Sequence, residues 1–110
     1  MTFKEINTMI ASFGVSYTYH EWNCEPDDVP PLPWVAFRYP NISDFYADNK
    51  NYQRVTALEI ELCTENKDFE TEQGIENILT SKGLTYNKIE DYIESERMFD
   101  VKYELEVVIT

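Results

Sequence analysis

The sequence predicts an α+β domain in which two helices pack on one face of a mostly antiparallel sheet. Two segments, 2–13 and 66–82, carry apolar residues at helical spacing, and a glycine follows each of them. The last segment, 98–110, alternates apolar and charged residues, which is typical of an antiparallel strand with one buried face. Eight Tyr and six Phe against three Gly also favour a sheet over a helical bundle. At 110 residues, we expect a single domain that spans residues 1–110.

The first helix is predicted over residues 2–13. Thr2 and Glu5 form a capping box, in which each side chain satisfies a free backbone N–H at the start of the helix. Gly14 supplies the left-handed residue that ends it. The apolar stripe of this helix consists of Phe3, Ile6, Met9, Ile10 and Phe13. A strand with alternating pattern is predicted over 15–22, and residues 23–33 form an acidic loop because their prolines cannot join a central strand.

The middle of the chain predicts a β-hairpin. A strand over 34–39 is ended, or confined to a sheet edge, by Pro40. Residues 44–54 then form a polar turn flanked by aromatic residues, since 48–51 are types that tolerate turn conformations. A long strand follows over 52–64. It places Leu58, Ile60 and Leu62 on one face, and Glu59, Glu61 and Cys63 on the other.

The second helix is predicted to begin after a cap at Asn66 or Asp68 and to run to about residue 82, where Gly83 closes it. Its apolar side consists of Phe69, Ile75, Ile78 and Leu79. A strand over 86–93 and a turn over 94–97 lead to the last strand. There one face carries Phe99, Val101, Tyr103, Leu105, Val107 and Ile109, and the other carries Met98, Asp100, Lys102, Glu104 and Glu106. The predicted order is therefore helix, strand, long loop, β-hairpin, helix and β-hairpin, with a charged outer sheet face that suits solvent or a polar partner.

The chain is strongly acidic, with 21 Asp and Glu against nine Lys and Arg and a net charge of −12. Affinity for a phosphate backbone or an anionic membrane requires the opposite sign, so we expect neither direct nucleic-acid binding nor membrane binding. No apolar run approaches membrane-spanning length and no signal pattern is present, which favours a reducing cytosol where Cys24 and Cys63 stay free; the alternative is a single Cys24–Cys63 disulfide. Evenly spread acidity is typical of a solvated surface. The alternative is an acidic inhibitor or DNA mimic that binds a basic partner.

Residues for catalysis or metal binding are few. His20 is the single histidine, so any Ser–His or Cys–His arrangement would have to use it. His20 and Cys24, even with Asp27 and Asp28 nearby, lack the paired ligand motifs of a zinc site. The glycines, at positions 14, 74 and 83, exclude a glycine-rich phosphate loop. The sequence therefore predicts a protein that is not an enzyme and that uses no cofactor and no metal.

Aromatic residues in predicted loops are the best candidates for binding, because such side chains are enriched in protein interfaces. The candidate assembly interface consists of Trp22, Trp34, Phe45, Tyr46, Asp48, Asn49, Lys50 and Tyr52. The alternative is that these rings fold back and cover the ends of the sheet.

Several segments resemble a family of small phage structural proteins. They are 31–37, the Asn-x-x-x-Phe-Tyr-Ala-Asp-Asn run that ends at Asn49, Tyr52, the strand 58–64, the helix start at Lys67 and Asp68, and the segments 83–86 and 92–98. In their order and spacing they are similar to the tail-terminator, or tail-completion, proteins of long-tailed phages and prophages of Gram-positive bacteria. The similarity covers roughly residues 30–107, and no single motif in it carries chemistry.

This resemblance implies an α/β subunit that assembles into a ring, a hexamer, on the end of the tail tube. There it would stop further tube addition and offer a surface to the head connector. The implied partners are other copies of the chain, the tail tube protein and the head-completion or connector protein. The implied location is the host cytoplasm during assembly and then the tail or neck of the virion. Members of the family are not enzymes and need no cofactor.

Overall fold

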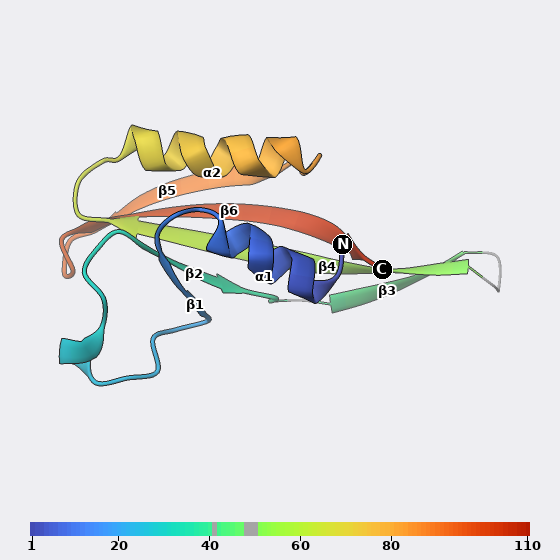
Figure 1. Ribbon diagram of the computed structural model, residues 1–110, viewed down its shortest axis with the longest axis horizontal. Coiled ribbons are helices and arrows are strands. Elements are labelled where there is room, and N and C mark those ends of the chain that lie inside the picture. Colours follow the sequence, from blue (N-terminus) through green and yellow to red (C-terminus); the bar gives the residue numbers. More distant parts are fainter. Residues whose placement is uncertain (41, 48–50) are drawn as a thin grey trace.

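The computed structural model describes the backbone of residues 1–40, 42–47 and 51–110, and the side chains of residues 1–40 and 54–110. Its elements in chain order are α1 (Phe3–Ala11), β1 (Ser16–Tyr19), the short 3-10 helix η1 (Pro26–Asp28), β2 (Trp34–Arg38), β3 (Ile42–Ala47), β4 (Asn51–Thr64), α2 (Phe69–Ser81), β5 (Asn87–Ile93) and β6 (Met98–Ile109). Figure 1 shows α2 above the strands and the β3–β4 hairpin extending away from the helices.

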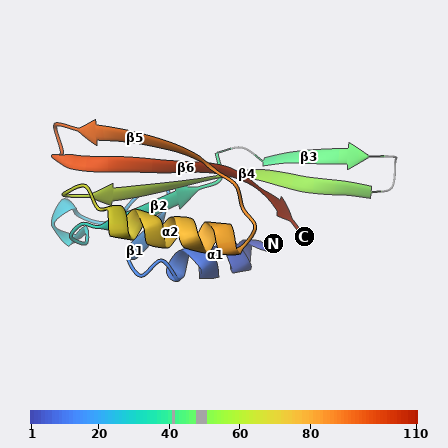
Figure 2. The same ribbon diagram turned by 90° about the horizontal axis from the view of Figure 1, so that it is seen from above.

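Six strands form one sheet in the order β1-β2-β4-β6-β5, and β3 pairs with β4 beside this path. The long strand β4 organises the sheet. It pairs with β6 along one edge, from Arg54 to Thr64, and with β2 and then β3 along the other. These pairs and the β5–β6 pair are antiparallel, whereas β1 and β2 run parallel. Figure 2 shows both helices on the same side of the strands. The predicted fold class is therefore confirmed.

The core lies between the helices and one face of the sheet. Across β2, β4 and β6, the paired positions form two apolar rows, Val35–Leu62–Val101 and Phe37–Ile60–Tyr103. The residues that cover these rows are Ile6, Met9 and Ile10 from α1 and Ile75 and Leu79 from α2. The alternation predicted for β4 and β6 is confirmed, because a side-chain period of two puts every second residue on this face.

Local interactions cap the start of both helices and the end of α2 as the sequence predicts, whereas α1 ends at Ala11 with Ser12 as its C-cap, before the predicted stop at Gly14. In α1, the Glu5 N–H donates to Thr2 Oγ1 and the Thr2 N–H donates to Glu5 Oε1, both at 3.1 Å. In α2, the N-cap residue is Asp68 and not Asn66, the other residue that the sequence offered. The helix ends with the Leu84 N–H donating to the Leu79 carbonyl at 3.0 Å and with Gly83 at a φ of 73°. This pair of features is the Schellman arrangement that a C-terminal glycine favours.

Asp68 accepts two hydrogen bonds from one residue: its Oδ2 from the Thr71 hydroxyl at 2.7 Å and its Oδ1 from the Thr71 N–H at 3.0 Å. These bonds lower the pKa of the Asp68 carboxyl below its ordinary 3.8. We therefore expect Asp68→Ala to lower the free energy of unfolding by about 1 kcal/mol at neutral pH. Because the folded-state pKa is depressed, this contribution is present above the unfolded pKa and is lost as the pH falls through the folded pKa.

Urea unfolding of both proteins at neutral pH and at a series of decreasing acidic pH values measures the difference. Asp68→Asn is the matched control, since an amide can still accept the cap hydrogen bond but does not ionise. A cost of Asp68→Ala that is as large in acid as at neutral pH would contradict the assignment to the ionised cap.

Several predicted strand boundaries differ from those in the structure. The first strand ends at Tyr19 and not at Trp22, because His20 has a φ of 68° and turns the chain out of the sheet. β2 ends at Arg38 and lies between β1 and β4, so the prediction that Pro40 ends this strand is confirmed and the alternative of an edge strand is wrong. The fifth strand begins at Asn87, one residue later than predicted.

The segment 44–54 is mostly strand, although its polar residues predicted a turn. β3 extends to Ala47 and β4 begins at Asn51, while residues 48–50 lie outside the described residues. The physical reason is that Phe and Tyr, which favour extended backbone, occupy this segment and that β4 offers a free edge next to β2. The first arm of the predicted hairpin is thus divided into β2 and β3.

The apolar side predicted for α2 is only partly correct. Ile75 and Leu79 are buried, but Phe69 is 72% exposed at the first turn of the helix. Glu72 takes an inward position instead and is 2% exposed. Its carboxylate lies 2.6 Å from Lys67 Nζ and 2.7 Å from Lys88 Nζ, so two cations compensate the buried charge. The Glu72–Lys88 ion pair therefore joins α2 to β5, in addition to the apolar contacts of the helix with the sheet.

None of the described helices is long and apolar enough to cross a membrane.

Candidate functional site

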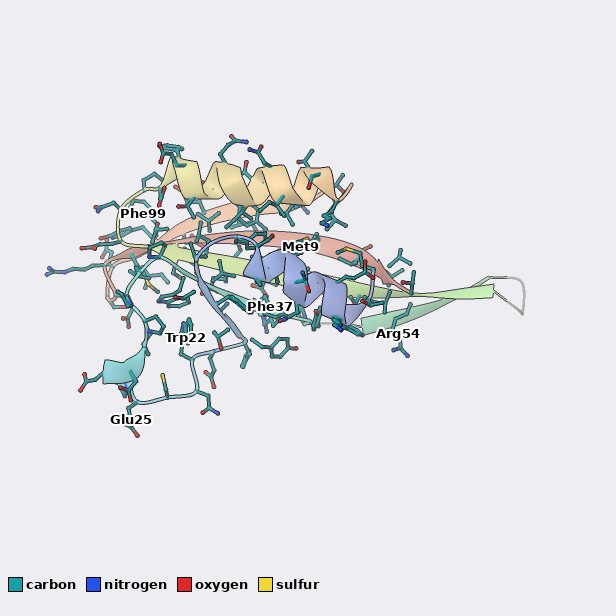
Figure 3. All side chains as sticks on the ribbon, in the orientation of Figure 1. Met9, Trp22, Glu25, Phe37, Arg54 and Phe99 are labelled. Atoms are coloured by element: carbon teal, nitrogen blue, oxygen red, sulfur yellow. The ribbon has the colours of Figure 1, made fainter. Side chains whose placement is uncertain are left out.

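The β3–β4 hairpin projects beyond the rest of the sheet (Figure 1). β6 ends its pairing with β4 at Ile109 opposite Arg54, whereas β3 continues to pair with β4 as far as Ala47 opposite Asn51. Figure 3 shows Arg54 at the root of this arm, beyond the helices. Beyond Arg54, the described part of the hairpin is a two-stranded ribbon. The molecule is accordingly elongated, with extents of 50 × 29 × 23 Å.

The structure brings part of the predicted assembly interface together on this arm. Phe45 and Tyr46 lie in β3 and Tyr52 lies in β4, where Tyr46 and Tyr52 occupy opposite positions of the ladder. Asp48, Asn49 and Lys50, which are also part of the prediction, lie outside the described residues. Their role in assembly stays a prediction.

Trp22 and Trp34, the other two predicted interface residues, lie at the opposite end of the sheet. Their rings pack edge to face, with centroids 5.9 Å apart and an interplanar angle of 83°. Both side chains are half-buried. Figure 3 shows Trp22 between the 20–33 loop and the strands, on the side away from α2. The two tryptophans therefore belong to a different surface from the hairpin, and they cover part of the sheet there.

The sheet face away from the helices carries a buried cluster near these tryptophans. Cys63 in β4 lies directly opposite Trp34 in β2 on one side and Asp100 in β6 on the other. Cys63 is 0% and Asp100 is 6% exposed, which differs from the prediction of a solvated outer face. Glu61, two residues before Cys63, points to the same face, and its Oε1 accepts a hydrogen bond from the Cys63 thiol at 3.5 Å. One thiol and two carboxylates thus converge.

Burial sets the ionisation of this cluster. It raises the pKa of Asp100 to about 6, and the neighbouring charge of Glu61 adds to the shift. Burial also raises the pKa of the Cys63 thiol far above its usual range, again with a contribution from Glu61. In this environment the Cys63 thiol is therefore neutral and unreactive at neutral pH, and it is not a nucleophile.

Around the cluster, the charged residues of this face are largely paired. The Arg38 guanidinium donates to Glu59 Oε2 at 2.6 Å, and Lys102 Nζ lies 3.9 Å from Glu59 Oε1. A shallow hollow opens beside Glu61; it is lined by His20, Ala36, Phe37, Arg38, Glu59, Glu61 and Lys102. This hollow connects Glu61 with solvent.

Residue spacing alone does not reveal this cluster. Glu61 and Cys63 are two residues apart on one strand, but Asp100 joins them only through the β4–β6 register. His20, Cys24, Asp27 and Asp28, which are close in sequence, do not converge as ligands, whereas Glu61, Cys63 and Asp100 do, within the described residues. Cys24 is exposed, Cys63 is buried, and both thiols are free.

No family model matches the sequence, and no curated protein matches it. A search of solved structures finds a chain of the virion of a native gene transfer agent (GTA) particle, with a TM-score of 0.61 and 14% sequence identity. The two chains share a fold. The match covers 92% of this chain and 83% of that chain. At this level of identity the similarity concerns the fold alone, and it extends over most of the sheet and its helices.

Proposed function

We propose that this chain is a non-enzymatic structural subunit of a phage-like particle. The observation that carries the proposal is the fold, shared over 92% of the chain with a subunit of a virion particle. The resemblance of segments between residues 30 and 107 to phage tail proteins supports it independently, because it rests on residue patterns and not on backbone shape. The chain's role in the particle is to cap the tail tube and to help join the tail to the head.

In this proposal the subunits form a closed ring, a hexamer, on the tail tube. A head-to-tail ring requires two different patches on each subunit. Its partners are further copies of the chain, the tail tube protein and a head-completion or connector protein. The protein accordingly acts in the host cytoplasm during assembly and then in the tail or neck of the virion.

The projecting hairpin is the first of the two patches. A two-stranded hairpin is marginally stable by itself in water, and beyond Arg54 this one receives no third strand from the described residues. The outer edge of β3 also presents backbone groups that a neighbouring strand can pair with. Contact with a neighbouring subunit would supply both the missing packing and the missing hydrogen bonds.

Removal of the gene from its phage or prophage tests the role in the particle. We expect tails that exceed their normal length or that fail to attach to heads, since nothing would stop tube addition or present the joining surface. Electron microscopy of the particles measures both outcomes, and the intact gene supplied in trans should restore them. Tails of normal length, joined to heads without the protein, would overturn the proposal.

Alanine at both Phe45 and Tyr46 tests the hairpin patch. We expect the double variant to fold, because both residues lie beyond the part of the sheet that the helices cover, but to restore tail joining at least about tenfold less well than the intact gene. The fold-change corresponds to about 1.4 kcal/mol, a modest value for the loss of two aromatic interface residues. Phe69→Ala is the matched control, since Phe69 is an exposed aromatic residue on α2. Equal complementation by both variants would exclude the hairpin as the patch.

The net charge of −12 favours one alternative, an acidic inhibitor or DNA mimic that binds a basic protein. Mimicry requires carboxylates aligned on one face at the spacing of phosphates. Here Glu59, Glu72 and Glu76 are instead engaged by Arg38, Lys67 and Lys88 within the chain. A tight complex with a nuclease or a DNA-binding protein that dissociates as salt is added would favour this alternative.

A further inference from the structure

We propose that Glu61, Cys63 and Asp100 form a binding site for a divalent zinc-class cation, which links β4 to β6 at the end of the sheet. The inference is independent of the role in a phage-like particle. One ligand atom from each of the three residues lies within 4.8 Å of the other two. The register explains this convergence: Cys63 and Asp100 are directly opposite each other, and Glu61 is the next residue of β4 on the same face.

The separation of the donors suits a single tetrahedral ion. Cys63 Sγ and Glu61 Oε1 are 3.5 Å apart. A sulfur and an oxygen bound to one tetrahedral zinc, at about 2.3 and 2.0 Å, would lie about 3.5 Å from each other. The ion can therefore replace the thiol–carboxylate hydrogen bond without a large movement of either side chain.

Asp100 provides an independent indication of a missing partner. Its side chain is 6% exposed, and its buried Oδ1 has no hydrogen-bond partner in the structure. A buried carboxylate oxygen normally has a hydrogen bond, a paired charge or a metal. Lys102, two residues along β6 and opposite Glu61, lowers the pKa of Asp100 in part, but its Nζ lies 3.9 Å from Glu59 Oε1 and it leaves Asp100 Oδ1 without a hydrogen bond. A bound cation would satisfy the Asp100 oxygen and offset the charge of both carboxylates.

The chemistry of the three donors selects the ion. Mg²⁺ and Ca²⁺ prefer sites made of oxygen ligands, whereas zinc accepts a thiolate together with carboxylates. Three protein ligands leave the fourth tetrahedral position to a water molecule, which the hollow beside Glu61 can admit. Binding converts the Cys63 thiol to a thiolate, so that one S–H bond breaks, one metal–sulfur bond forms and the proton passes to solvent.

Titration of the full chain with Co²⁺, as a spectroscopic substitute for zinc, tests the site. We expect one Co²⁺ per chain, a near-ultraviolet charge-transfer band from a thiolate ligand, visible bands of tetrahedral intensity, and loss of all of them when Zn²⁺ is added. Cys63→Ser should abolish the charge-transfer band. Cys24→Ser is the matched control and should keep it, because Cys24 is exposed and outside the cluster. Adventitious binding to surface carboxylates would give no thiolate band.

Two further variants keep the test decisive if Cys63→Ser fails to fold. Glu61→Gln changes a partly exposed ligand, and Asp100→Asn removes the charge of the buried one. Each should weaken Co²⁺ binding by at least about tenfold, since even residues that only orient metal ligands have effects of that size. Absence of the thiolate band in the intact chain, or its survival with equal affinity in both carboxylate variants, would overturn the proposal.

Discussion

Replacing Ile60 by alanine is expected to lower the free energy of unfolding by about 3–4 kcal/mol. Ile60 is 0% exposed and lies at the centre of the core, between Phe37 on β2 and Tyr103 on β6. Alanine would remove three carbon atoms from a position where two large aromatic neighbours are held by the strand register. These neighbours cannot close the resulting cavity easily, which places the cost in the upper part of the range for such substitutions.

Urea unfolding followed by circular dichroism measures this change, and the matched control is Ile89→Ala. Ile89 is also an isoleucine in a strand of the same sheet, but it is 43% exposed on the edge strand β5. We expect the control to cost less than about 1 kcal/mol. Similar losses for the two variants would mean that the core is not centred on the β2–β4–β6 rows.

Replacing Glu72 by alanine is expected to cost about 2–3 kcal/mol. The side chain is 3% exposed, and its removal would leave Lys67 and Lys88 without the carboxylate that they share. Removing one partner of a fully buried ion pair typically costs about 3–5 kcal/mol. The value here should be lower, because the lysine side chains are 23% and 35% exposed and water can compensate their charges in part.

Glu70→Ala is the matched control for this prediction. Glu70 lies two residues before Glu72 on the exposed side of α2, so its replacement should change stability by less than about 0.5 kcal/mol. Lys88→Met combined with Glu72→Ala completes a double-mutant cycle that isolates the pair. A Glu72→Ala protein as stable as the control would show that the buried charge contributes nothing net to the fold.

The regular elements of this protein follow from interactions between residues that are close in sequence. The Thr2–Glu5 capping box and the Gly83 helix end each involve residues a few positions apart. The alternation of β6 requires only that one face be buried. Sequence patterns could therefore predict the helices, the last strand and the α+β class.

The hairpin and the position of Glu72 could not be predicted in the same way. Whether segment 42–47 becomes turn or strand depends on the free edge of β4, which exists only once β2 has ended at Arg38. Likewise, a glutamate on an amphipathic helix is predicted to face solvent. Glu72 faces inward because lysines before the helix and on β5 meet it there.

The same distinction between local and tertiary interactions applies to the candidate sites. The sequence by itself determined an acidic α+β chain with aromatic residues in the hairpin, where Phe45, Tyr46 and Tyr52 are the residues of interest for assembly. Only the tertiary structure decided that Trp22 and Trp34 belong to another surface and that Glu61, Cys63 and Asp100 converge. The physical reason is that helix caps and side-chain alternation depend on neighbours along the chain, whereas the cross-strand register joins residues far apart in sequence.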